Sequence, residues 1–113
     1  VILVPLSTNN NKKIITFADF CENEKIPVII VGSSYLGTIN HTLLTTEFLR
    51  SKKINVLGFI LNYVREPVSL AEKLNKKALK NILQKNFLGY IPYQEKPQKA
   101  LVKWEAIFNK IGL

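Results

Sequence analysis

Residues 28–44 read VIIVGSSYLGTINHTLL, in which an apolar segment passes through a turn with two glycines into a helical pattern. The uninterrupted, β-branched run Val28–Val31 is typical of a strand that is buried on both faces. The helical pattern continues to Lys53, and its apolar positions are Ile39, Leu43, Leu44 and Phe48. A buried strand that leads directly into a helix is the repeating unit of a parallel α/β sheet.

The same alternation extends in both directions along the chain. We expect further strands at Val1–Val4, Asn55–Asn62 and Phe87–Ile91, and a polar loop at Ser7–Lys13. Further helices are expected at Phe17–Lys25, led by Thr16, at Pro67–Gln84 and at Gln98–Lys110. The residues expected on the apolar sides of these helices are Phe17, Phe20 and the core residue Cys21 in the first, Leu70, Leu74, Ala78 and Ile82 in the second, and Leu101, Trp104, Ile107 and Phe108 in the third. The fold class is therefore α/β, with a mostly parallel sheet, helices on both faces, and residues 1–113 as one unit. Because a strand is expected at residue 1 itself, we also expect the sheet to continue upstream of Val1.

Charge and composition narrow the classes of partner. The chain has 113 residues, a net charge of +8 and a single cysteine, Cys21, so it contains no internal disulfide. Arg50 and Arg65 are its only arginines, whereas proteins that read nucleic acid usually rely on arginine. The lysines are more typical of a solvated surface, and no apolar run is long enough to span a membrane. We therefore expect no nucleic-acid or membrane partner, and a cytoplasmic location.

Ligands of open parallel sheets bind at the carboxyl ends of the strands. The segment Gly32–His41 follows such a strand end and enters a helix for which Thr38 is the expected N-cap. The free N–H groups at this helix start could bind a carboxylate or phosphate. Alternatively, the turn could be an ordinary helix start. Asn62, at the next strand end, could contact the edge of a purine base or form a turn. The sole histidine, His41, leaves no histidine pair, and no glycine precedes a lysine as in a phosphate-binding loop. The sequence thus has loops suited to binding and no visible catalytic group.

Several segments, in order and spacing, resemble the dethiobiotin synthetase family. They are Val4-Pro5-Leu6-Ser7, Thr16-Phe17-Ala18-Asp19, Ile26–Val31, Leu36–Thr45, Val56–Asn62 and Leu88–Pro92. The segment Leu-Gly-Thr-Ile-Asn-His-Thr-Leu-Leu at 36–44 is the most specific of them. The resemblance covers essentially the whole chain, but only the C-terminal half of the family's domain, which has a P-loop NTPase-like fold.

The resemblance implies an ATP-dependent ligase of biotin biosynthesis that works as a homodimer. Such an enzyme carboxylates 7,8-diaminononanoate with CO2, phosphorylates the carbamate from MgATP, and closes the ring to give dethiobiotin. By the same resemblance, Gly37, Thr38, Ile39 and Asn40 hold the substrate carboxylate for the partner subunit's active site. Asn62, with Pro92 and Tyr93, forms the adenine and ribose site, where Lys96 departs from the family pattern.

The family's phosphate loop and its magnesium ligands fall upstream of Val1, so none is expected in this chain. We therefore expect no catalytic residue here, and no activity from the isolated chain without an N-terminal half, either fused or separate. Three alternatives remain open. One is a degenerate relative that serves in dimerisation or regulation, and another is a dethiobiotin-synthetase-like domain of another enzyme, such as an acyltransferase or a cobyrinate amidase relative. The third, which the shortage of arginine disfavours, is nucleic-acid binding through the lysine-rich helix expected at Pro67–Gln84.

Overall fold

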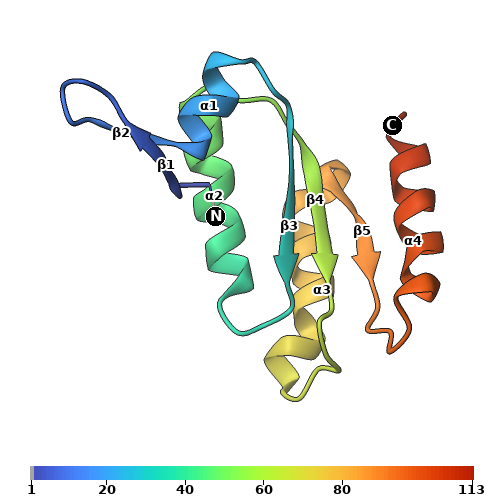
Figure 1. Cartoon of the computed structure of the whole chain (residues 1–113). Coiled ribbons are helices and arrows are strands. Elements are labelled where there is room, and N and C mark those ends of the chain that lie inside the picture. Colours follow the sequence, from blue (N-terminus) through green and yellow to red (C-terminus); the bar gives the residue numbers. More distant parts are fainter. Residues whose placement is uncertain (1) are drawn as a thin grey trace.

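The computed structural model describes residues 2–113, and a three-stranded parallel sheet lies at its centre (Figure 1). Its strands are β3 (Val28–Ser33), β4 (Val56–Asn62) and β5 (Phe87–Ile91), in the order β3-β4-β5. The helices are α1 (Phe17–Asn23), α2 (Thr38–Ser51), α3 (Leu70–Leu83) and α4 (Pro97–Lys110), with a short 3₁₀ turn at Gln84–Asn86. The expected order of strand and helix from residue 26 onward is confirmed.

Alternate residues of β4 show how the helices cover the sheet. Phe59 and Leu61 pack against Leu79 and Leu83 of α3, on the face that α2 also covers. Ile60, which points to the opposite face, packs against Ile107 of α4. Helices therefore lie on both faces, which confirms the expected α/β class.

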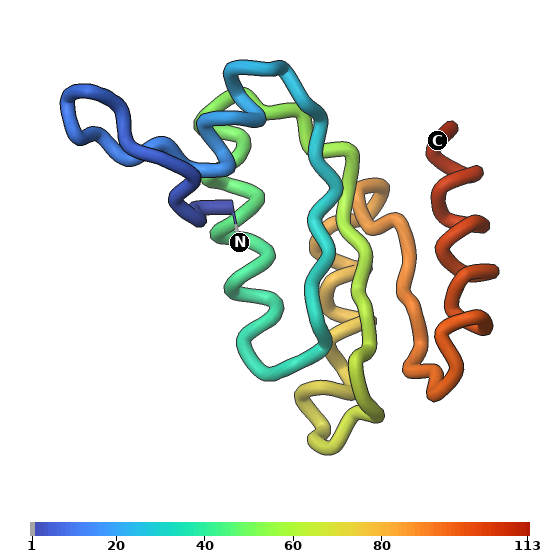
Figure 2. The backbone as a smooth tube through the Cα atoms, in the orientation of Figure 1, coloured from blue at the N-terminus to red at the C-terminus, as the bar shows by residue number. Residues whose placement is uncertain are grey.

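The N-terminal segment differs from the prediction. The buried strand expected at Val1–Val4 is wrong at residues 2–4, which form no strand and in which Leu3 and Val4 are exposed, while Val1 lies outside the described residues. The carbonyls of Ile2 and Val4 accept hydrogen bonds from Ala18 and Phe17 at 3.0 Å, which ties this segment to the start of α1. The polar loop expected at Ser7–Lys13 is confirmed only over residues 9–13, because Ser7 and Thr8 belong to β1 (Pro5–Thr8), which pairs antiparallel with β2 (Ile14–Thr16) in a separate small sheet. The hairpin extends away from the central sheet along the chain trace (Figure 2).

The helix N-termini follow local chemistry. Thr16 caps α1 as expected, and its backbone N–H donates to Asp19 Oδ2 at 2.7 Å in a capping box. Pro67 does not begin α3; Ser69 caps that helix instead, because its hydroxyl accepts from the N–H of Glu72 at 3.2 Å.

The expected apolar sides of the helices are partly wrong. Cys21 is buried in the core as expected, but Phe17, Phe20, Leu43, Leu44, Leu70, Leu74, Ile82 and Leu101 are exposed. The buried residues of α2 are Thr38, Thr42, Thr46 and Leu49, and those of α3 are Glu72, Asn75, Leu79 and Leu83. Both helices therefore turn partly polar faces inward.

Candidate functional site

The carboxyl ends of the three parallel strands meet at one edge of the sheet. Ser33 at the end of β3 is in register with Asn62 of β4, which is in register with Ile91 of β5. The N–H of Tyr63 donates to the carbonyl of Ile91 at 2.9 Å and extends the pairing past the end of β4. The predicted ligand-binding loops thus start from neighbouring positions.

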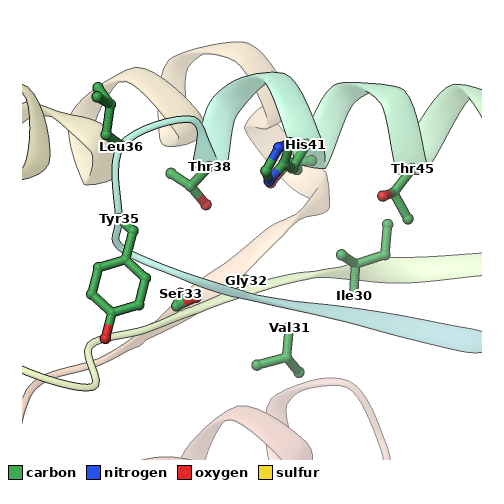
Figure 3. A pocket seen from close by; sticks show the side chains of 10 residues that line it. Ile30, Val31, Gly32, Ser33, Tyr35, Leu36, Thr38, His41 and Thr45 are labelled. Atoms are coloured by element: carbon green, nitrogen blue, oxygen red, sulfur yellow. The ribbon is translucent and has the colours of Figure 1, made fainter. Parts of the chain in front are cut away.

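A cavity of about 340 Å³ lies between β3 and α2 (Figure 3). Figure 3 shows Thr38 and Thr45 extending from α2 towards β3, with His41 between them in the sequence, while Tyr35 comes from the connecting loop. The wall is therefore partly hydroxyl-bearing and partly apolar. Gly32 permits this close approach, because a Cβ there would lie 2.8 Å from Phe59 Cζ and 3.3 Å from Thr38 Oγ1.

The start of α2 has the geometry of an anion-binding turn. Gly37 is the N-cap with φ of +92°, a conformation that favours glycine, so the prediction of Thr38 as N-cap is wrong by one residue. The N–H of Thr38 donates to the carbonyl of Tyr35 at 3.1 Å. Within residues 2–113, the N–H groups of Ile39 and Asn40 have no acceptor, as expected for the first turn of a helix. Two donors at the positive end of the helix dipole therefore remain available to an anion.

Asn75 of α3 holds the loop that leads to this turn. Its side-chain Nδ2 donates to the carbonyls of Ser34 at 3.1 Å and Tyr35 at 3.4 Å. Asn75 is only 6% exposed and Ser34 only 1% exposed. The loop is thus fixed to α3 by buried hydrogen bonds.

An ion pair holds the neighbouring loop, between β4 and α3. The Arg65 guanidinium binds both carboxylate oxygens of Glu72 at 2.9 Å, and Glu72 also accepts from the N–H of Val68 at 2.9 Å. Arg65 lies over the ring of Tyr35 at 4.8 Å, which joins the two loops. The hydrogen bonds from Arg65, and next the one from Val68, hold the pKa of Glu72 below its ordinary value, so this carboxylate is charged at neutral pH.

The predicted adenine-site residues lie at the same edge but around a different hollow. Tyr93 lines a cleft of about 320 Å³ together with Glu66 and Lys96, and this cleft shares no residue with the cavity at α2. Asn62 is half-buried and lines neither the cavity at α2 nor the cleft at Tyr93. It is in register with Ser33 at the end of β3 and with Ile91 at the end of β5, so it lies between the strand ends from which the two loops start. Pro92 directly follows β5 and is half-buried. The structure therefore brings Asn62, Pro92 and Tyr93 to the same edge as Gly37–Asn40, without joining them in one cavity.

Sequence patterns did not indicate the residues that support the site, which are Tyr35, Arg65, Glu72 and Asn75. One signal was available: Ser69 and Glu72 have the spacing of an N-cap and its third helical residue. Nothing in the sequence pattern indicated that Asn75 is buried, because the assumed apolar side of α3 was centred on Leu74.

Comparison with known proteins places the chain in a family. A family model described as an AAA domain matches residues 3–100. The chain belongs to this family. Its fold is P-loop NTPase-like, in agreement with the parallel sheet and flanking helices.

Three individual relatives are dethiobiotin synthetases by name. The chain is 40% identical over 112 residues to an ATP-dependent dethiobiotin synthetase of Thermodesulfovibrio yellowstonii. This match covers 96% of the chain and 46% of that relative. It is 39% identical to the enzyme of that name from Neorickettsia sennetsu, covering 81% of the chain and 34% of the relative. For the enzyme of that name from Bacillus velezensis the identity is 37%, over 80% of the chain and 37% of the relative. The chain thus spans less than half the length of these relatives and corresponds to the C-terminal half of the family, which confirms the resemblance seen in the sequence.

Proposed function

We propose that this chain is the C-terminal part of an ATP-dependent ligase that converts 7,8-diaminononanoate, CO2 and ATP into dethiobiotin in the cytoplasm. The relatives' names support the reaction, and the observation that carries the proposal is the turn at Gly37 with its two free N–H groups. Within residues 2–113 no helix is long and apolar enough to cross a membrane.

The first turn of α2 is the proposed substrate-carboxylate site. The N–H groups of Ile39 and Asn40 would donate to the carboxylate, and Gly37 allows its close approach because it has no side chain. The nearest atom to a Cβ at Gly37 would be His41 Cε1 at 3.8 Å, so space exists in front of the turn.

The adenine of ATP is proposed to bind at Asn62, with Pro92 and Tyr93 beside the ribose. The amide of Asn62 offers both a donor and an acceptor, which suits the edge of a purine, and it lies half-buried at the carboxyl end of β4. Lys96 and Glu66 also border the cleft at Tyr93, so this part of the site is more polar than a simple stacking surface.

The triphosphate and Mg²⁺ are not assigned to residues of this chain. Among residues 2–113 there is no cluster of three or more Asp, Glu, His or Cys side chains able to hold a metal. β3 pairs only with β4 among the described strands, and Val31 on β3 is 52% exposed. We propose that the family's N-terminal half, which supplies the phosphate loop, pairs along this open edge of β3.

A homodimer is part of the proposal, because the carboxylate site would serve the partner subunit. Leu36 is 80% exposed beside the turn, and Leu43 and Leu44 are exposed on the first turns of α2. Apolar side chains of this kind, clustered around a binding turn, are suited to a subunit interface.

A chimera tests the proposal. The part of the Thermodesulfovibrio yellowstonii relative that precedes its match is fused to this chain, and dethiobiotin formation is measured with purified protein. We expect activity from the chimera and none from the chain alone. Asn62→Leu should raise the KM for ATP about tenfold or more, since the variant would lose two hydrogen bonds to the purine that contribute about 0.5–1.5 kcal/mol each. Asn81→Ala, an exposed change on α3, is the matched control.

A folded chimera without activity would contradict the ligase proposal. It would favour the degenerate dimerisation or regulatory relative if the chain still self-associates. It would favour a domain of another enzyme if the chain instead binds ATP with the upstream half but does not rescue a biotin auxotroph.

A further inference from the structure

A groove distinct from the β3–α2 cavity lies at β5, the last strand in the order β3-β4-β5 among residues 2–113. This β5 groove has a volume of about 430 Å³ and is walled by Lys76, Lys77 and Lys80 of α3 and by Lys110 of α4, with Leu88 and Tyr90 of β5 at its base. It shares no residue with the cavity at α2 or the cleft at Tyr93. It is therefore separate from both parts of the candidate site.

The β5 groove is strongly and uniformly positive. No Asp or Glu lines it, and none of its four lysines forms an ion pair within residues 2–113. Lys76 Nζ lies 4.1 Å from the centre of the Tyr90 ring, and this cation–π contact keeps the ammonium at the groove. Four uncompensated cations around a partly apolar base fit a ligand that carries several negative charges.

The base of the groove also offers unpaired backbone. Among the strands of residues 2–113, β5 pairs only with β4, and the Ile91 carbonyl accepts from the N–H of Tyr63 on that side. Because successive strand residues direct their backbone groups to opposite sides, the N–H and C=O of Tyr90 point away from β4 and into the groove. An extended peptide could therefore pair with β5 as an added strand.

We propose that the β5 groove binds an extended acidic segment of a partner protein, which adds to the sheet beside β5. The spacing of charges supports this occupant. Alternate side chains on one face of a strand are about 6.6 Å apart. Lys76 and Lys80 lie four residues apart on α3, where the Cβ atoms of such residues are about 6 Å apart. Two acidic side chains at alternate positions thus match these two lysines, and Lys110 of α4 adds a further cation to the groove. The proposal is independent of the ligase function.

The competing explanation is that the lysines only protect a strand edge from unwanted pairing. The two explanations differ in their consequences, because a protective edge binds no peptide at all.

The test uses the full chain and a fluorescein-labelled seven-residue peptide that alternates glutamate and valine, with binding followed by fluorescence anisotropy. We expect saturable binding that weakens at least tenfold in the double variant Lys76→Glu, Lys80→Glu. Lys13→Glu with Lys103→Glu changes the net charge equally at exposed positions outside the groove, and it should leave binding unchanged. Circular dichroism of each variant verifies folding, and Lys76→Gln with Lys80→Gln provides a milder pair.

Two further probes separate strand pairing from simple charge attraction. The same peptide with alternate backbone amides N-methylated retains its charges but loses its ladder donors, so its binding should fall at least tenfold. A single-stranded dT oligonucleotide of equal charge should bind more weakly than the peptide. Absence of peptide binding, equal binding of the methylated peptide, tighter binding of the oligonucleotide, or equal loss in the control variant would each overturn the proposal.

Discussion

Replacing Asn75 by alanine should release the loop that carries the candidate carboxylate site. The side chain donates to two backbone carbonyls, those of Ser34 and Tyr35, and the longer of these bonds, at 3.4 Å, is the weaker. A net hydrogen bond contributes about 0.5–1.5 kcal/mol, and a buried acceptor left without a donor costs about 1–3 kcal/mol. Ser34 is only 1% exposed, so its carbonyl would lose its donor in a buried position. We therefore expect Asn75→Ala to reduce the free energy of unfolding by about 2 kcal/mol.

The assay combines urea unfolding with amide hydrogen exchange. A loss of about 2 kcal/mol corresponds to a fall in Tm of about 8 °C for a domain of this size. In hydrogen exchange, the same loss in the local opening equilibrium would speed exchange about 30-fold. The informative amide is that of Thr38, which donates to the Tyr35 carbonyl and is protected only while the loop is closed.

Two companion variants make the result interpretable. Asn75→Asp removes the donor and adds a negative charge beside two carbonyls, so it should be more destabilising than Asn75→Ala. Asn81→Ala, at an exposed position of the same helix, should change stability by less than about 0.5 kcal/mol. If Asn75→Ala behaved like Asn81→Ala, or destabilised the fold while the Thr38 amide kept its protection, the loop-anchoring role of Asn75 would be refuted.

Three further predictions concern neighbouring features. Gly37→Ala places a side chain at φ of +92°, so stability should fall by about 1 kcal/mol in urea unfolding, and the chimera's KM for 7,8-diaminononanoate should rise. Gly32→Ala brings a Cβ to 2.8 Å from the Phe59 ring, and thermal unfolding should show about 1–3 kcal/mol of lost stability from overpacking. In the folded chain the pKa of Glu72 lies below its ordinary 4.5, so its contribution to the free energy of unfolding is complete above pH 4.5 and is lost as the pH falls below that value. When stability is followed during acid titration, Glu72→Gln should therefore lose stability less steeply than the parent. An unchanged slope would contradict the role of Arg65.

The sequence was sufficient to predict the central sheet, because each strand is a continuous apolar run bounded by a turn. The same criterion failed at residues 2–4, where the carbonyls of Ile2 and Val4 accept hydrogen bonds from the start of α1 and the segment is not a strand. The position of the turn at Gly37 was predictable from the glycine–helix pattern, apart from the one-residue error at the cap. The hydrogen bonds from Asn75 that hold the loop before this turn could not be predicted, because Asn75 lies 41 residues from Ser34 in the chain and no local sequence pattern indicates such a contact.

The inward polar face of α3 explains why hydrophobic spacing misplaced that helix. A purely apolar side centred on Leu74 would maximise burial, yet Leu74 is half exposed and Glu72 and Asn75 are buried in its place. A buried charge and a buried amide are costly unless they are hydrogen-bonded, and both are: Glu72 to Arg65 and Val68, and Asn75 to the loop carbonyls.

These buried contacts give α3 a role in the geometry of the site as well as in the core. Asn75 fixes the loop before Gly37, and Glu72 fixes the loop that follows Asn62, so both loops are attached to the same helix, α3. Arg65 over the Tyr35 ring adds a direct link between the two loops. A change in α3 should therefore displace the turn at Gly37 and the strand end at Asn62 together, whereas a change within either loop should affect one alone. That coupling follows from the polar contacts, and an apolar α3 of equal stability would not provide it.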